Sequence, residues 1–262
     1  MRRSLFAKGP WSRARTLLET PDRRILIGLD LDGTLAPLAP RPELARVPGS
    51  TLRAIRRAAR APGITIAILS ARPVRDLRRL LPVRGLMRIG QYGLEGPLAP
   101  AVATRTRLRR RCARVTRALM TEIGAVPGAL LEPKGLTVAV HSRSVKGSPA
   151  RRALFRAVRS VAAGEARERG FITMPGAEIV DFVPRGQDKG RPLRALRDRL
   201  RPDAVFYFGD SDGDEPAFRA LDRGDFPVRV GRGETRARFR VAGLGSVTRF
   251  LVAVTALRAG PA

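Results

Sequence analysis

The sequence predicts an α/β protein built on a mostly parallel sheet, with a small α+β domain inserted into it. Towards both ends of the chain, short apolar runs alternate with segments of helical periodicity. Strands that alternate with helices usually form a parallel sheet covered on both faces. In the middle of the chain, strand-like segments instead follow one another through tight turns, which indicates antiparallel pairing.

The alternating part starts with strands expected over 24–30 and 64–70, separated by a helix over 50–60. A helix over 74–81 then leads to a third strand over 86–90. Further along, a helix over 190–200 precedes strands over 204–209 and 227–230. Each strand is short and rich in apolar residues, which is typical of strands buried on both faces.

The middle of the chain has the pattern αββαββ. After an arginine-rich helix come strands over 130–134 and 136–142, a helix over 149–169, and strands over 171–174 and 179–183. The turns at Gly135 and at Pro175-Gly176 are too short for a crossover. We therefore expect an inserted domain over 101–183, a core over 23–100 and 184–262, and an N-terminal extension over 1–22. Two such domains would form a ligand-binding cleft.

The chain is strongly basic, with 51 Lys+Arg against 23 Asp+Glu and a formal net charge of +28. Seven arginines fall within residues 105–117. In the same region Leu108, Cys112, Val115, Leu119 and Ile123 recur every three or four residues. This spacing predicts one buried helix stripe with arginines on the solvated faces, and aromatic residues make up only 5% of the chain. We do not expect a nucleic-acid partner.

Composition excludes several other classes of protein. A single cysteine rules out a disulfide framework or a multi-cysteine zinc site. No apolar run reaches the roughly 18 residues of a membrane span, and the N-terminal segment has no signal-peptide pattern. We expect a monomeric cytoplasmic protein with no membrane partner.

Acidic residues cluster after two of the expected strands. Asp30 and Asp32 follow the first strand, and Asp210, Asp212, Asp214 and Glu215 follow the strand over 204–209. Ligands of open α/β sheets bind at the carboxyl ends of strands. Clustered carboxylates need a cation or must take up protons, and oxygen ligands favour Mg²⁺. Because Asp30 and Asp32 are two residues apart on extended backbone, one carboxylate could attack while the other transfers a proton.

Three further residues suit an anionic ligand. Ser70 and Arg72 follow the second strand and could bind an oxyanion, although Ser70 could equally be a helix N-cap. Lys189 begins a helix, where the helix dipole and the ammonium group both favour phosphate.

The motifs LDLDGTL, ILSAR, QDKG and FGDSDGDE occur in the order typical of the haloacid-dehalogenase-like phosphatase superfamily, which the chain resembles. This resemblance implies a Rossmann-like core with an α+β cap. Over residues 25–251 the chain is more closely similar to trehalose-6-phosphate phosphatases. That likeness rests on Tyr92-Gly-Leu-Glu95, Glu132-Pro-Lys134, His141-Ser-Arg143 and Glu178 ahead of Lys189. Ser211, Gly213, Ala71 and Tyr92 depart from the family pattern.

The resemblance implies a role for each matching residue. Asp30 would be the nucleophile and Asp32 the general acid and base. Mg²⁺ would be bound by the Asp30 carboxylate, the Asp32 backbone carbonyl and Asp210, with Asp214 orienting the site. Ser70 and Lys189 would bind the phosphoryl group. The sugar would be bound by Arg72, Glu95, Glu132, Lys134, Arg143 and Glu178, and we expect His141 to be structural.

The function implied is Mg²⁺-dependent hydrolysis of trehalose 6-phosphate, with a small sugar phosphate as the partner. Two alternatives stay open. The first is the same chemistry on another sugar phosphate, of the sucrose-phosphate or glucosylglycerate-phosphate type. The second is a catalytically retired, basic nucleic-acid-binding or scaffold protein, which rests on the net charge alone.

Overall fold

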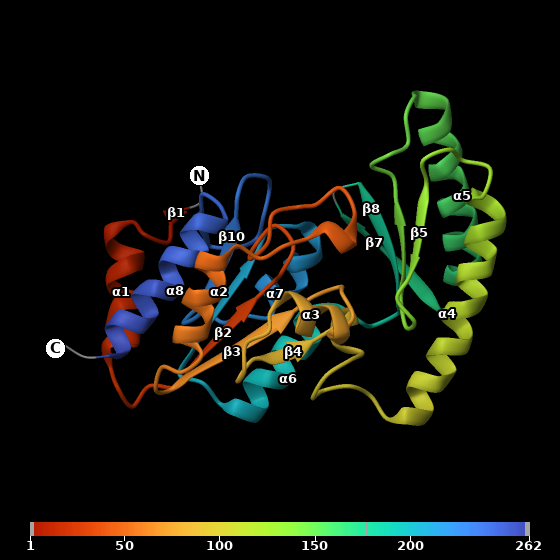
Figure 1. The fold of residues 1–262 in the computed structure, drawn as a ribbon. Helices are drawn as coiled ribbons and strands as arrows, with labels where there is room; N and C mark the ends of the chain where they lie inside the picture. The colour runs from red at the N-terminus through yellow and green to blue at the C-terminus, as the bar shows by residue number, and fades with distance from the viewer. Residues whose placement is uncertain (1–2, 177, 260–262) are drawn as a thin grey trace. The chain divides into compact units, whose positions relative to one another are not determined.

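The computed structural model describes residues 3–176 and 178–259, and the chain divides into two units (Figure 1). The core unit comprises Met1–Leu98 and Asp188–Ala262, and the inserted unit comprises Ala99–Gln187. Each unit has its own buried apolar core.

The core unit contains one parallel sheet of seven strands, in the order β1-β11-β10-β9-β2-β3-β4. This confirms the predicted α/β class. The strands are β1 (Arg3–Ser4), β2 (Ile25–Leu29), β3 (Ile64–Leu69), β4 (Met87–Ile89), β9 (Ala204–Gly209), β10 (Phe226–Val230) and β11 (Phe239–Val241). The carboxyl ends of β2 and β9, which precede the two acidic clusters, lie next to each other because these two strands pair directly.

Helices cover both faces of this sheet. They are α1 (Lys8–Glu19), α2 (Gly49–Ala58), α3 (Val74–Leu80), α6 (Gly190–Leu200), α7 (Glu215–Arg219) and α8 (Leu244–Arg258). Alternate residues of a strand point to opposite faces, so Phe206 packs in the cluster with α1, α2 and α8, whereas Val205 packs with α6 and α7. The apolar runs of the strands are thus buried from both sides.

Residues 3–19 belong to the core unit instead of forming a separate extension. β1 pairs with β11, and Ala14 and Leu18 of α1 are fully buried in the core. Arg258 at the end of α8 donates hydrogen bonds to the carbonyl oxygens of Thr20 and Pro21, 2.8 Å from each. The sequence analysis did not predict α7, α8, β1 or β11.

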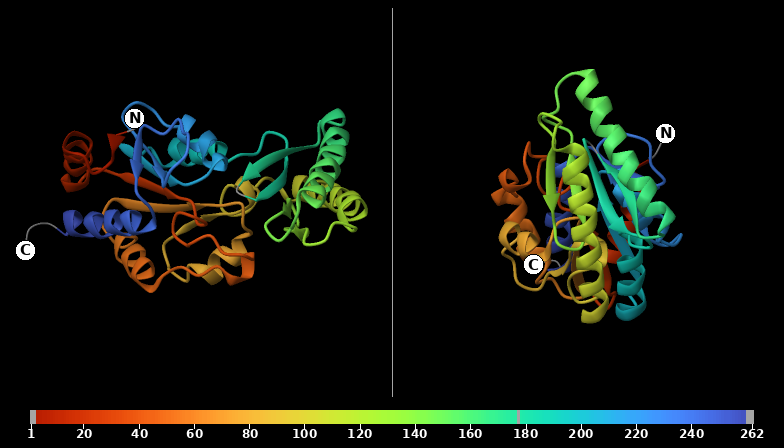
Figure 2. Two further views of the ribbon diagram at one scale, coloured as in Figure 1. Left: turned by 90° about the horizontal axis from the view of Figure 1, so that it is seen from above. Right: turned by 90° about the vertical axis from the view of Figure 1, so that its right-hand side faces the viewer.

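The inserted unit is a four-stranded antiparallel sheet covered by two helices that lie side by side (Figure 2). The strand order is β5-β6-β8-β7. The elements are α4 (Val102–Ile123), β5 (Leu130–Pro133), β6 (Val138–His141), α5 (Ser148–Arg167), β7 (Phe171–Gly176) and β8 (Ile179–Pro184). The predicted apolar stripe of α4 is confirmed, because Cys112, Val115, Leu119 and Ile123 are all buried.

Within residues 3–176 and 178–259, none of the helices combines the length and the apolar character that a membrane crossing requires.

We expect Phe206→Ala to lower the free energy of unfolding by about 3–5 kcal/mol, because it leaves a cavity in the core. Phe206 is fully buried, its ring stacks on Phe226 at 4.3 Å, and it lies 5.1 Å from the ring of Phe250. Urea denaturation measures the loss. Val252→Ala, on the exposed side of α8, is the control and should change stability by less than about 0.5 kcal/mol. Equal losses in both variants would contradict this account of the core.

Candidate active site

A buried lysine joins the two acidic clusters at the carboxyl edge of the parallel sheet. Asp30 directly follows β2, and its backbone N–H donates to Phe208 O at 2.9 Å, which continues the pairing of β2 with β9. Lys189 precedes α6, and its Nζ lies 2.8 Å from Asp30 Oδ1 and 2.8 Å from Asp214 Oδ1. All three side chains are nearly excluded from solvent, so one ammonium group holds two buried carboxylates together.

Both oxygens of Asp214 accept further hydrogen bonds. The Tyr207 hydroxyl donates to Oδ1 at 2.8 Å, and the backbone N–H and hydroxyl of Ser211 donate to Oδ2, each at 3.0 Å. The Tyr207 ring packs against the backbone of Gly28. A Cβ at position 28 would lie 2.6 Å from this ring, so a side chain there would clash with it. The sequence analysis missed Tyr207, which is a polar group inside an apolar strand.

Asp210 completes a cluster suited to a cation. Ligand oxygens of Asp30, Asp210 and Asp214 lie within 4.8 Å of one another. Asp210 Oδ1 is buried, and none of the described residues forms a hydrogen bond with it. A buried carboxylate oxygen without a donor, next to two other carboxylates, matches the oxygen donors that Mg²⁺ requires. The residues present therefore fit a hard divalent cation.

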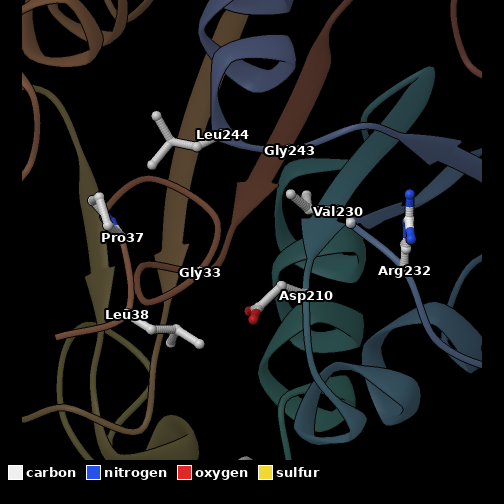
Figure 3. Close-up of a pocket in the computed structure, with 9 residues that line it drawn as sticks. Gly33, Pro37, Leu38, Asp210, Val230, Arg232, Gly243 and Leu244 are labelled. Atoms are coloured by element: carbon white, nitrogen blue, oxygen red, sulfur yellow. The ribbon is translucent and has the colours of Figure 1, made fainter. Parts of the chain in front are cut away.

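The carboxylate of Asp210 points toward the turn at Gly33 (Figure 3). Gly33 has φ +80°, and a Cβ at this position would lie 2.0 Å from Asp210 Oδ2. Only glycine fits here, because the backbone conformation and the close approach both exclude a side chain. Gly33 and Asp210 line a pocket of about 470 Å³ in the core unit, together with Leu38, Arg232 and Leu244 among others.

Burial and the proximity of several carboxylates shift the pKa values of the groups in this cluster. Burial raises the pKa of Asp30 well above its usual range, and the charges of Asp214 and Asp210 add to this, while Lys189 opposes it. Burial and the Asp214 charge raise the pKa of Asp210 to about 6. Burial alone would lower the pKa of Lys189, but the charges of Asp214 and Asp30 outweigh it and raise that pKa.

Asp32 and Arg72 form a bidentate ion pair beside this cluster. Arg72 Nε donates to Asp32 Oδ2 at 2.6 Å, and Nη2 donates to Asp32 Oδ1 at 2.8 Å. Ser70, at the end of β3, is buried, and its Oγ accepts a hydrogen bond from the Arg72 backbone N–H at 3.1 Å. Because Oγ is the acceptor in this contact, the Ser70 hydroxyl keeps its own proton for donation to another group.

Glu95 holds the start of α3 in place. Its Oε2 accepts from the Val74 backbone N–H at 2.6 Å, and its Oε1 accepts from Gln91 Nε2 at 2.7 Å. Both contacts are to the protein, so Glu95 acts here as a cap for the first turn of α3.

The inserted unit carries a charged cluster on one face of its sheet. Glu132 and Asp181 both pair in register with Ala139 and so share a face, which is opposite to the face that Val138 and Phe182 pack under the helices. Lys134 Nζ lies 2.7 Å from Asp181 Oδ1 and 3.9 Å from Glu132 Oε2. Asp181 is buried, and the sequence analysis missed it.

The remaining expected residues of the inserted unit are also paired. His141 Nε2 lies 2.8 Å from Glu132 Oε2. Glu178 is exposed and contacts Arg143 at 3.0 Å and Arg151 at 3.3 Å. Its hydrogen bond with Arg143 lowers the pKa of Glu178. The structure thus places Glu132, Lys134 and His141 in one cluster, and Arg143 with Glu178 in another.

Comparison with known proteins gives a consistent result. A family model described as trehalose-phosphatase matches residues 28–242. The trehalose-6-phosphate phosphatase of Escherichia coli is 29% identical over 250 residues, which is 91% of this chain and 90% of that protein. The bifunctional trehalose-6-phosphate synthase/phosphatase of Thermoproteus tenax is 32% identical over 225 residues, 84% of this chain but 30% of that protein.

Among solved structures, the C-terminal domain of a C. albicans trehalose-6-phosphate phosphatase has the same fold. The TM-score is 0.80 at 18% identity, and the match covers 98% of this chain and 99% of that domain.

We expect Asp210→Asn to stabilise the protein in buffer that contains no divalent cation. Because folding raises the pKa of Asp210 from 3.8 to about 6, the unfolded state loses this proton first, and wild-type stability falls as pH rises between these values. The stability of the variant relative to wild type should therefore increase by up to about 3 kcal/mol from pH 4 to pH 7. Denaturation in EDTA at several pH values measures this, and a difference that does not change with pH would contradict it.

Proposed function

Because the chain belongs to the trehalose-phosphatase family, we propose that it hydrolyses trehalose 6-phosphate to trehalose and phosphate through a phosphorylated Asp30. One observation supports this chemistry above the others. Lys189 holds Asp30 and Asp214 at 2.8 Å each, beside the unpartnered oxygen of Asp210. This arrangement presents a nucleophile next to positive charge and next to a fitting cation site.

In this proposal, Ser70 and Lys189 bind the phosphoryl oxygens. The Lys189 ammonium has three N–H donors, and two of them point to Asp30 and Asp214. The third can donate to a phosphoryl oxygen, together with the Ser70 hydroxyl. Both groups would stabilise the negative charge that spreads over these oxygens in the transition state.

Asp30 then attacks phosphorus, and the bond between phosphorus and the sugar oxygen breaks. Asp32 gives its proton to that oxygen, so the sugar leaves as a neutral alcohol. In the second step, Asp32 takes a proton from a water molecule whose oxygen attacks the phosphorus on Asp30, and the bond between that phosphorus and the Asp30 oxygen breaks. Phosphate leaves, the Asp30 carboxylate is restored, and Asp32 again carries the proton for the next turnover.

Mg²⁺ is the cation that we propose for the acidic cluster. The carboxylates of Asp30 and Asp210 and the backbone carbonyl of Asp32 would hold it, while the hydrogen bonds to Asp214 keep that side chain in place as an orienting group. A bound divalent cation supplies positive charge that lets an anionic nucleophile approach an anionic phosphate.

The charged face of the inserted unit would recognise the sugar. Glu132 and Lys134 offer an acceptor and a donor on one sheet face, and Asp181 fixes the ammonium of Lys134. Such polar groups discriminate between sugars, because a wrong hydroxyl pattern leaves a polar partner without a hydrogen bond. Arg143 and Glu178 are proposed as further sugar contacts from the same unit.

The direct test is phosphate release from trehalose 6-phosphate. We expect Asp30→Asn to lower kcat by about 10³-fold or more, since it removes the nucleophile. Asp198→Asn, an exposed residue on α6, is the control and should leave activity unchanged. Comparable turnover of several unrelated sugar phosphates would favour the wider substrate class, and full activity of the Asp30 variant would refute the mechanism.

A second test concerns the cation and does not depend on turnover. Mg²⁺ at a hundred times its Kd should stabilise the wild-type protein by about 2.7 kcal/mol, visible as a higher Tm. The same addition should leave the Tm of Asp210→Asn almost unchanged, because one of the proposed ligands is lost. Equal shifts in both proteins would place the cation elsewhere.

A third test separates sugar recognition from chemistry. We expect Glu132→Gln to reduce kcat/KM for trehalose 6-phosphate by about 10-fold, as for the loss of a hydrogen bond to a charged group. Turnover of p-nitrophenyl phosphate, which has no sugar, should be unaffected. Glu168→Gln is the matched control, because Glu168 pairs with Arg111 in the helical layer of the same unit. Equal losses on both substrates would contradict a role in sugar binding.

A further inference from the structure

We propose that Arg72 is a positioning residue that acts through Asp32, whose carboxylate it holds in the orientation needed for proton transfer. This inference rests on the proposed phosphatase function. It gives Arg72 a different task from the sugar contact expected from the sequence.

The guanidinium of Arg72 donates hydrogen bonds to acceptors of the protein itself. Nε and Nη2 donate to the two oxygens of Asp32 at 2.6 and 2.8 Å, and Nη1 donates to the carbonyl oxygen of Pro42 at 2.8 Å. Each of its three nitrogens therefore has an acceptor in the core unit. The Arg72 side chain is 10% exposed, whereas that of Asp32 is 29% exposed. Asp32 is thus the member of the pair that a substrate can reach.

The backbone of Arg72 is anchored on both sides. Its N–H donates to Ser70 Oγ at 3.1 Å, and its carbonyl oxygen accepts from the Gln91 backbone N–H at 3.0 Å. Gly90 makes room for this carbonyl oxygen, since a Cβ at position 90 would lie 2.7 Å from it. A side chain attached to such a fixed backbone can set the position of its partner. Through its N–H, Arg72 also orients Ser70, the proposed phosphate ligand.

The pairing restricts the orientation of the Asp32 carboxylate. The guanidinium uses one acceptor site on each oxygen, and each oxygen keeps a second lone pair that can carry a proton. In the first step the Asp32 O–H bond breaks, the proton goes to the leaving oxygen, and the electron pair stays on Asp32. In the second step an O–H bond of water breaks, and its proton returns to Asp32. In both steps the contacts with Arg72 keep the carboxylate in position.

A double-mutant cycle tests this inference, because a residue that acts only through Asp32 has no effect once Asp32 is disabled. We expect Arg72→Met to lower kcat for trehalose 6-phosphate by about 10- to 100-fold, which is part of the roughly 10²- to 10⁴-fold that proton transfer contributes, with KM changed less than about 3-fold. In an Asp32→Asn background, the same change should cost less than about 2-fold, measured with p-nitrophenyl phosphate. Arg75→Met, exposed on α3, is the control.

Arg72→Lys is the conservative variant. It keeps the positive charge but cannot contact both oxygens of Asp32 at once, so its kcat should lie between those of wild type and Arg72→Met. If Arg72→Met does not fold, Arg72→Lys is used in both backgrounds to complete the same cycle.

Three outcomes would overturn the inference. A raised KM with unchanged kcat would make Arg72 a substrate contact. An equal loss in the wild-type and Asp32→Asn backgrounds would mean that Arg72 acts independently of Asp32. If the wild-type enzyme releases phosphate from neither substrate, the proposed function and this inference both fail. Release from p-nitrophenyl phosphate alone would overturn the sugar assignment but leave the cycle decisive for Arg72.

Discussion

The arrangement of the candidate site depends on one buried ammonium group. Lys189 contacts Asp30 and Asp214, which follow two neighbouring strands, and without it these carboxylates would repel each other in a region with little water. One positive charge does not balance three acids, so Asp210 stays poorly neutralised. The parallel sheet brings the acids together, the lysine makes their proximity tolerable, and the unbalanced charge provides the reason for a cation.

Much of the fold could be predicted from the sequence, because its central strands are apolar runs and the helix stripe of α4 has clear periodicity. The helix α8 was missed, although its apolar residues are numerous, since they surround the helix instead of forming one stripe. The short strands β1 and β11, of two and three residues, carry too little pattern to recognise. Whether α8, β1 and β11 form depends on how these segments pack against distant parts of the chain.

The candidate site divides in the same way. Asp30, Asp210 and Lys189 were found because the chemistry is visible in local motifs at strand and helix ends. Tyr207 and Asp181 were missed, because each contacts its partner from within a strand whose sequence is otherwise apolar. The pairing of Arg72 with Asp32 joins residues 40 positions apart. Which partner a charged side chain selects depends on tertiary geometry, and one sequence does not contain that information in readable form.

The contact between Gly28 and Tyr207 links two positions that pair directly in neighbouring strands. The ring occupies the volume that a side chain at position 28 would need, so Gly28 cannot take a side chain while Tyr207 is kept. Across the family, the two positions should therefore covary: a bulkier residue at the first should accompany a smaller one at the second. Where Tyr207 is replaced in this way, the Asp214 carboxylate would need another hydrogen-bond donor in place of the tyrosine hydroxyl.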